Sequence, residues 1–294
     1  IKLRRTVLLS ACCLSCHLSD HFSYDFFSYG LCKSLGWDMT TSRKAATSAD
    51  TDGDGKITLK ELAKAAQKAG IVVNVMLDIN IGMDRTGMGP GELLNCHGLF
   101  SVPTTAAGCN ALEEFERKLL GKKKVSAVAT PLASAKMGQS VTPIADCVKA
   151  GMNVALGTGG AIECGNLDMF EVMRFAAMDA RKESGDPAAL PSSAALMMAT
   201  VTGAQAQGRS AECGMLQEGM DADIVLVDFT APHLMPCHNV ITSLVFSAKG
   251  GDVALTMVRG KILYQSGRFP TINLPEVVEE ITGYAIPKLL EESK

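Results

Sequence analysis

The sequence predicts an α/β fold, with a helix–loop–helix segment before it and a small β-rich segment after it. Between residues 71 and 210, short runs of β-branched apolar residues alternate with amphipathic helical segments. Strands and helices that alternate at this spacing indicate βαβ units and a parallel sheet. An acidic loop of twelve residues precedes this region, and two short strands split by Gly260 come after it.

The composition is that of a globular protein. Of the 294 residues, 47% are hydrophobic and 20% are charged, which is too apolar for a disordered chain. The formal net charge of −3 predicts no binding to nucleic acid or to an anionic membrane. The length suits one large domain or two smaller ones.

The first 37 residues are predicted to form an irregular leader. Its basic start and the apolar stretch from Thr6 to Cys16 weakly resemble a signal peptide, but the stretch is too short to span a membrane. A fragment, or a translated leader that does not fold, is the alternative that the missing initial Met favours. We therefore expect a cytoplasmic protein.

Ten cysteines are present, and four of them crowd the leader. A disulfide framework is typical of short secreted domains, so we expect reduced, structural cysteines here. The Cys12-Cys13-x-x-Cys16 run is a metal-site alternative, although no second Cys or His pair lies at zinc-site spacing.

Residues 38–70 are predicted to form an EF-hand-like segment whose loop, residues 50–61, binds calcium. Calcium takes six to eight oxygen ligands, and the loop fills every position of the pattern D-x-D-x-D-G-x₅-E. Lys56 would contribute its backbone carbonyl, Thr58 a bridging water, and Glu61 both carboxylate oxygens. The other predicted ligands are Asp50, Asp52 and Asp54. A solvated acidic turn before a helix is the alternative.

The region before this loop fits an EF-hand less well. Its entering helix offers only Ala45, Ala46 and Ala49 for packing, and no second loop of this pattern occurs in the chain. Ile57, at the eighth loop position, suits a short strand that pairs with a neighbouring loop. A lone hand usually needs a partner, for example the same loop from another copy.

The elements of the region 71–210 are predicted from apolar periodicity and from helix start and stop signals. Strands are predicted at residues 71–77, 125–129 and 153–157, helices at 111–120, 144–150, 166–183 and 192–207, and a loop at 82–110. The last region, 211–294, is predicted to contain strands at 223–228, 253–259 and 261–265 and a charged helix at 275–293.

Several ordered motifs carry a resemblance to a known family. They are Asn153-Val-Ala-Leu-Gly-Thr-Gly-Gly160, Asn166-Leu-Asp-Met-Phe-Glu-Val-Met173, the stretches 214–228 and 232–238, and the stretches 258–264 and 266–269. The region from Val125 to Phe269 thus resembles the amidohydrolase superfamily, in its branch of cytosine, guanine and methylthioadenosine/adenosylhomocysteine deaminases and chlorohydrolases. The resemblance implies a TIM-like (β/α)₈ barrel with a small β-sandwich. It also implies hydrolysis of a C–N bond in a nucleobase- or nucleoside-like small molecule, assisted by zinc or iron.

The sequence departs from the family at the metal ligands. None of its five histidines forms the family's His-x-His pair or its His-x-x-Glu motif, and Gly159 stands where the motif Gly-Thr-Asp-Gly carries a metal-binding Asp. Ala129-Thr130-Pro131 replaces a His-containing segment. We therefore expect that these positions do not assemble the family's metal site.

One histidine matches a substrate-contacting segment of the family. His97, in the stretch from Asn95 to Ser101, is our candidate substrate-binding residue, with a loop or core histidine as the alternative. His233 and His238 are interpreted as structural. Glu163 and Asp168 lie near the expected catalytic edge, and Asp168 is predicted to cap the helix after it.

The sequence leaves three hypotheses open. The chain is a deaminase-branch amidohydrolase without its catalytic metal, either an incomplete gene product or a non-catalytic relative. Alternatively, it is a calcium-responsive binding module on a barrel scaffold, or two artificially joined pieces. A barrel needs eight strands, and only three or four candidates precede residue 211, so we expect a partial barrel. Uncovered strand edges and apolar faces favour self-association.

Overall fold

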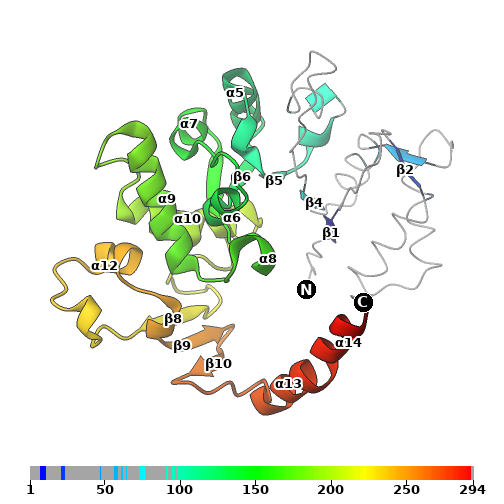
Figure 1. Ribbon diagram of the computed structural model, residues 1–294. Coiled ribbons are helices and arrows are strands. Elements are labelled where there is room, and N and C mark those ends of the chain that lie inside the picture. Colours follow the sequence, from blue (N-terminus) through cyan, green and yellow to red (C-terminus); the bar gives the residue numbers. More distant parts are fainter. Residues whose placement is uncertain are drawn as a thin grey trace.

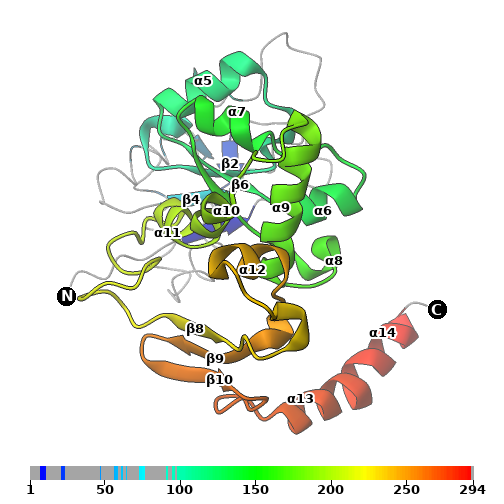
Figure 2. The ribbon, with the colours of Figure 1, turned by 90° about the vertical axis from the view of Figure 1, so that its left-hand side faces the viewer.

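The computed structural model describes the chain without a gap from residue 98 to residue 292. Before residue 98 it describes residues 7–10, 21–23, 47, 56–58, 61, 64, 73–76, 91 and 95–96. The central feature is a parallel sheet of three strands, covered by helices (Figures 1 and 2). An antiparallel sheet, also of three strands, and a terminal helix come after it in the chain.

The central sheet has the order β5-β6-β7. Its strands are β5 (Thr105–Ala107), β6 (Ser126–Ala129) and β7 (Asn153–Leu156). The predicted strands at 125–129 and 153–157 agree with β6 and β7, and their parallel pairing confirms the βαβ pattern. The prediction of a loop over 82–110 was wrong at β5, because this strand is three residues long and contains two alanines instead of a β-branched run.

Two further strand pairs lie in the first part of the chain. Strand β4 (Val73–Met76) agrees with the strand predicted at 71–77, and it pairs in parallel with β1 (Val7–Ser10). Strand β3 (Lys56–Thr58) pairs antiparallel with β2 (His21–Ser23). The leader that was expected to be irregular therefore contributes two short strands.

Helices surround the central sheet (Figure 1). They are α5 (Glu114–Lys122), α6 (Pro131–Lys136), α7 (Ile144–Lys149), α8 (Ala161–Cys164), α9 (Met169–Ser184), α10 (Ser192–Ala199) and α11 (Val201–Ala206). All of them except α8 contribute buried side chains. The helix predicted at 111–120 begins later, because residues 109–111 form the 3₁₀ turn η2 (Cys109–Ala111). The helix predicted at 192–207 is divided at Thr200, whose φ and ψ are −125° and −86°.

The hydrophobic core lies between the sheet and these helices. Leu120, Val125 and Val172 are completely buried in it, and Val245 joins them from the C-terminal part of the chain. Methionine fills core gaps well because its side chain is unbranched and polarizable. Met173 and Met198 are buried, whereas the side chain of Met197 is half exposed.

The C-terminal sheet is antiparallel, with the order β10-β9-β8. Its strands are β8 (Ile224–Val227), β9 (Val253–Val258) and β10 (Lys261–Gln265), in agreement with the prediction. Gly260 lies in the turn of the β9–β10 hairpin, where its φ is 76°. A positive φ of this kind is typical of tight hairpin turns, so it agrees with the predicted split of the two strands at Gly260. Helix α12 (Val240–Phe246) was not predicted.

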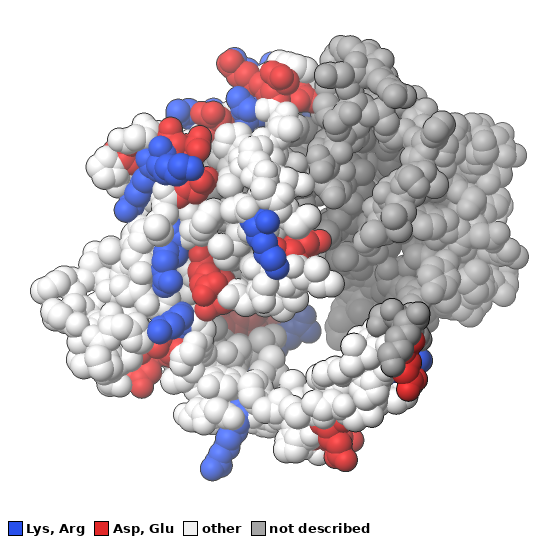
Figure 3. All heavy atoms as spheres, in the orientation of Figure 1, with Lys and Arg blue, Asp and Glu red and all other residues white. Residues whose placement is uncertain are grey.

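A helical rod ends the described chain. It consists of α13 (Leu274–Glu280), the π turn η5 (Ile281–Ala285) and α14 (Ile286–Glu292), and it runs away from the C-terminal sheet in Figure 2. On the face drawn in Figure 3, charges of both signs are interspersed. The rod is mostly uncharged on this face and carries a few acidic side chains. Within the described residues, none of the helices has the length and apolarity needed to cross a membrane.

Candidate functional site at the carboxyl edge of the parallel sheet

The carboxyl ends of β5, β6 and β7 meet at one edge of the sheet. Ala107 pairs with Val128, Ala129 pairs with Leu156, and the amide of Gly157 donates to the carbonyl of Ala129 at 2.9 Å. The loops that leave this edge are therefore neighbours. Active sites of parallel α/β barrels lie at such edges, so these loops form the candidate site.

A small polar network joins two of these loops. The side-chain amide of Asn110 donates to Ser134 Oγ at 3.1 Å, and Thr142 Oγ1 donates to Asn110 Oδ1 at 2.7 Å. Ser134 and Thr142 are buried. Because the three side chains bond to one another, they fix the loops after β5 and β6. Sequence reasoning missed this network, because its members are small polar residues far apart in the chain.

The loop after β7 is built around Gly159, whose φ is 73°. A β-carbon added to Gly159 would lie 3.2 Å from Glu163 Oε2 and 3.3 Å from the β-carbon of Ala133. Both the backbone angle and the narrow space therefore favour glycine. The departure from the Gly-Thr-Asp-Gly motif thus fits the local structure.

Glu163 is the carboxylate nearest to this glycine, and it is engaged in a helix cap. Its Oε2 atom accepts a hydrogen bond from the amide of Gly160 at 2.6 Å, at the start of the short helix α8. Within the described part of the chain, no three His, Cys, Asp or Glu side chains gather as a metal would require. The described residues of this edge therefore do not fit a zinc or iron centre.

Most of the predicted ligand residues lie outside the described residues. These are His97, the candidate substrate contact, and Asp50, Asp52 and Asp54 of the acidic loop. Lys56 and Thr58 are described only by their place in strand β3. Glu61 is helical and only 5% exposed. Of the predicted ligands, only Glu61 therefore has a described side chain.

Asp168 caps α9, as predicted. Its Oδ1 atom accepts from the amide of Phe170 at 2.8 Å, at the positive end of the helix dipole. Its Oδ2 atom accepts from the amide of Gly250 at 2.8 Å. Asp168 therefore joins the C-terminal part of the chain to the helix that comes after the candidate site.

His233 forms a hydrogen-bonded pair with Asp252. His233 Nε2 lies 2.9 Å from Asp252 Oδ2, which also accepts from the amide of Lys249 at 3.0 Å. Burial of Asp252 disfavours its charge, but the hydrogen bonds from His233 and Lys249 outweigh burial, so its pKa lies below the ordinary value. The pair links the 3₁₀ turns η3 (Pro232–Leu234) and η4 (Gly250–Asp252). This agrees with a structural role for His233, although both His233 and His238 are exposed.

The cysteines near the edge are unsuited to nucleophilic chemistry. Burial, with the nearby Cys147 and Glu116, raises the pKa of the Cys109 thiol to about 12. Burial raises the pKa of the Cys147 thiol to about 11. The nearby Asp146 also raises this pKa, whereas Arg117 lowers it. Both thiols are therefore protonated at neutral pH. The six described cysteines are free, as expected for reduced residues.

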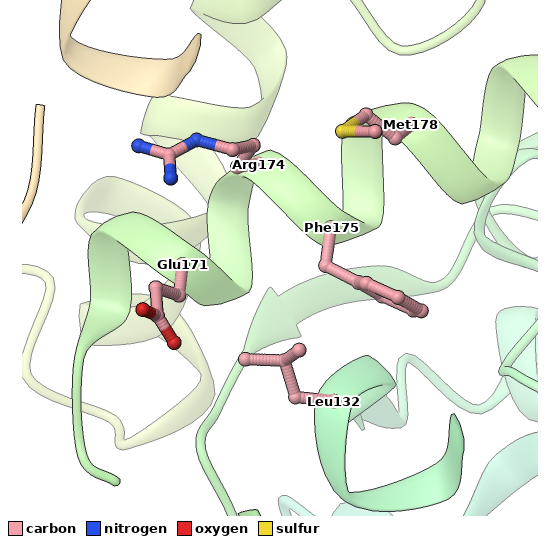
Figure 4. Close-up of a pocket in the computed structure, with 5 residues that line it drawn as sticks. All are labelled: Leu132, Glu171, Arg174, Phe175 and Met178. Carbon is pink, nitrogen blue, oxygen red and sulfur yellow. The ribbon is translucent and has the colours of Figure 1, made fainter. Parts of the chain in front are cut away.

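A shallow hollow of about 170 Å³ lies between α6 and α9. Figure 4 shows Leu132 and Phe175 projecting into the space between these helices. The two charged residues of the lining are engaged elsewhere. Arg174 donates to the carbonyl of Ala248, and Glu171 accepts from the side-chain amide of Asn166 at 2.7 Å. The hollow therefore offers mainly apolar contacts, and the buried Nε of Arg174 has no hydrogen-bond partner.

Comparison with known proteins shows which family this chain is similar to. The profile described as "Amidohydrolase family" matches residues 45–263, a range that includes the acidic loop. The 5-methylthioadenosine/S-adenosylhomocysteine deaminase of Moorella thermoacetica is 38% identical over 229 residues, which are 76% of this chain and 54% of that protein. The 5'-deoxyadenosine deaminase of Methanosarcina acetivorans is 37% identical over 215 residues, which are 72% of this chain and 49% of that protein. The chain spans about half the length of these curated relatives.

Solved structures show the same fold. An adenosine deaminase from Xanthomonas campestris with bound zinc has a TM-score of 0.73 at 20% identity, with 90% of this chain and 69% of that chain covered. An atrazine chlorohydrolase from Arthrobacter aurescens complexed with zinc has a TM-score of 0.69 at 23% identity, with 78% and 52% covered.

Proposed function

Because this chain belongs to the amidohydrolase family, we propose that it is a deaminase-type member that binds a nucleoside-like small molecule but does not itself hydrolyse it. Gly159 carries this proposal, since it stands where the resembled motif has a metal-binding carboxylate. Its positive φ and the nearby Glu163 leave little room for a side chain. Zinc sites are built from Cys, His, Asp and Glu ligands, and glycine supplies none of these.

The test combines a metal measurement with an activity measurement. The purified full chain is incubated with zinc and dialysed, and its zinc content is measured. Ammonia release is then monitored with 5'-methylthioadenosine, S-adenosylhomocysteine and 5'-deoxyadenosine. The deaminase of Moorella thermoacetica is the positive control. We expect less than one zinc per chain and ammonia release at the buffer rate. Turnover that a chelator abolishes would contradict the proposal.

Ligand binding without turnover is the second part of the proposal, with His97 as a contact to the ligand. The deaminase relatives support a nucleoside-like ligand, and an imidazole can donate or accept hydrogen bonds at a nucleobase. Calorimetric titration with 5'-deoxyadenosine should show binding that His97→Ala weakens about tenfold or more, the loss of roughly one good hydrogen bond. Absence of binding, or equal binding by the variant, would refute this part.

Calcium binding by residues 50–61 is a second candidate function. One observation favours it: strand β3 (Lys56–Thr58) occupies the seventh to ninth positions of the loop and is paired with another strand. A short strand at this place is what the EF-hand pattern predicts. Glu61, at the twelfth position, is helical and buried. These features support a loop that holds one calcium ion through its oxygen ligands.

Calorimetry with calcium tests this function on the wild type, Asp52→Asn and Glu61→Gln. Each substitution removes one charged ligand, so we expect affinity to fall at least tenfold in both variants. Circular dichroism checks that Glu61→Gln is folded, because that residue is buried. Asp78→Asn, outside the loop, should bind as the wild type does. A wild type that does not bind calcium, or two loop variants that bind it unchanged, would rule this function out.

A further inference from the structure

The terminal rod, residues 274–292, exposes an unusual amount of apolar surface. Apolar side chains along it are between 38% and 66% exposed: Val277, Val278, Ile281, Ile286, Leu289 and Leu290. Among the described elements, its main contacts run within the rod itself. At 1.5 Å per residue, the rod is roughly 28 Å long. A solvent-exposed helix with such a surface normally packs against something.

The π turn aligns this apolar surface into one stripe. Ile286 and Leu290 lie five and nine residues after Ile281, so a regular α-helix would place them on its opposite side. A π turn inserts about one extra residue into the helix and rotates the next turns about the helix axis. The turn at Ile281–Ala285 therefore brings Ile286 and Leu290 back toward the face of Val277, Val278 and Ile281. An extra turn that restores a continuous apolar stripe indicates a binding face.

The C-terminal sheet also exposes apolar side chains, on both of its faces. Val225 and Leu226 are adjacent in β8, and they are 54% and 52% exposed. Successive residues of a strand point to opposite faces of the sheet. Val258 and Phe269, at the two ends of the β9–β10 hairpin, are 39% and 38% exposed. Each face of the sheet therefore carries an exposed apolar side chain from β8 that an apolar helix can cover.

The charges of the rod and the hairpin are complementary. Residues 274–292 contain five glutamates and one lysine, whereas residues 253–269 contain three cations and no carboxylate. Lys261 and Arg268 are exposed, while Arg259 is paired with Asp221 at 3.3 Å. Opposite charges around an apolar contact set its orientation and exclude wrong partners. The acidic rod is also a poor match for an anionic membrane surface, which prefers Lys- and Arg-rich helices.

We propose that the chain forms a two-fold dimer in which the terminal rod of each copy covers the C-terminal sheet of the other. The apolar stripe lies on the sheet, and glutamates of the rod face Lys261 and Arg268 of the hairpin. A two-fold axis makes the contact twice, which brings the interface toward the size of about 800 Å² per partner that stable dimers need.

Sedimentation velocity over a concentration series tests the dimer. The hairpin variant Lys261→Glu/Arg268→Glu and the rod variant Glu276→Lys/Glu279→Lys/Glu280→Lys each reverse one side of the charge match. Each should raise the dissociation constant about tenfold, and the two sets combined in one chain should restore it. Lys118→Glu/Lys149→Glu reverses two exposed cations elsewhere and should leave the dimer unchanged.

Two results would overturn the proposal. A wild type that stays monomeric at all concentrations would show that the rod does not pair with a second copy. A dimer that the hairpin variant leaves unchanged would show that the rod packs on another surface, such as a second rod. Circular dichroism should show folded variants, because every substituted side chain is exposed.

Discussion

The loop after β7 depends on one residue whose backbone angle suits glycine. Gly159 has a φ of 73°, and its neighbours Glu163 and Ala133 leave only 3.2 Å and 3.3 Å to an added β-carbon. Restoring the family's aspartate therefore meets two obstacles, strain in the backbone and a second carboxylate beside Glu163. At the scale of single residues, glycine at this position is part of a locally consistent structure.

We predict that Gly159→Asp destabilises the protein by about 2–3 kcal/mol. Backbone strain contributes about 1–2 kcal/mol, and crowding by Glu163 and Ala133 adds to it. Gly159→Asn should cost less, because asparagine tolerates this conformation and carries no charge. Urea denaturation measures the differences.

Gly138→Ala, compared with Gly159→Ala, is the matched control for the crowding at Gly159. Gly138 has a φ of 68°, and an added β-carbon there would meet nothing within 4 Å. It therefore reports the backbone cost alone. If Gly159→Ala costs no more than Gly138→Ala, the crowding argument at Gly159 is wrong.

The lowered pKa of Asp252 leads to a prediction about how the stability of the fold depends on pH. Its pKa is lowered in the folded state, so its ionised form stabilises the fold above the ordinary carboxyl pKa. This contribution should be lost as the pH falls below about 4 and the carboxylate takes up a proton. Denaturation midpoints at a series of pH values should therefore fall more steeply at acid pH for the wild type than for Asp252→Asn. Equal slopes would argue against the pair with His233.

At the scale of elements, helix α11 covers the free edge of β7. Thr202 Oγ1 donates to the carbonyl of Val154 at 2.9 Å, and the side-chain amide of Asn153 donates to the carbonyl of Thr202 at 3.0 Å. Exposed strand edges promote aggregation, so a helix bonded to this edge protects it. The break at Thr200 allows α11 to turn away from α10 and reach the strand.

We predict that Thr202→Val destabilises the protein by about 1–2 kcal/mol and increases its aggregation. Valine keeps the shape of threonine but cannot donate to Val154, which leaves a carbonyl without that partner. Thr200→Val removes a bond to the carbonyl of Leu196 within the same helical region, and serves as the control. Urea denaturation and light scattering give the two readouts. Similar aggregation by both variants would contradict edge protection by Thr202.

At the scale of the whole molecule, two buried thiols report on cooperative unfolding. Cys109 and Cys147 are completely buried, and burial raises their pKa values to about 12 and about 11. Cys96 and Cys237 are exposed. The first two thiols therefore become reactive only when the core opens.

Alkylation with iodoacetamide at pH 8, with peptide mass spectrometry as the readout, measures this directly. We expect Cys237 to react at least about tenfold faster than Cys109 and Cys147 in the native protein, because Cys237 is exposed and burial blocks access to the other two thiols and raises their pKa. In urea the rates should converge at the unfolding midpoint. Fast alkylation of Cys109 in the native protein would indicate that the core is open.

The sequence by itself determined the parts of this protein that depend on local pattern. Parallel strands at β6 and β7, the β9–β10 hairpin, the cap at Asp168 and the family membership all result from periodicity, turn residues and ordered motifs. These features need only neighbouring residues or a contiguous motif. The absence of a carboxylate at Gly159 was visible in the same way.

Only the tertiary structure decided the features that depend on contacts between distant segments. Strand β5 has little strand propensity of its own, and it forms because β6 supplies its hydrogen bonds. The Asn110–Ser134–Thr142 network, the closure of β7 by Thr202, and the exposure of the terminal rod have no local signal. Such features depend on which surfaces the fold brings together, and a sequence pattern does not specify those surfaces one residue at a time.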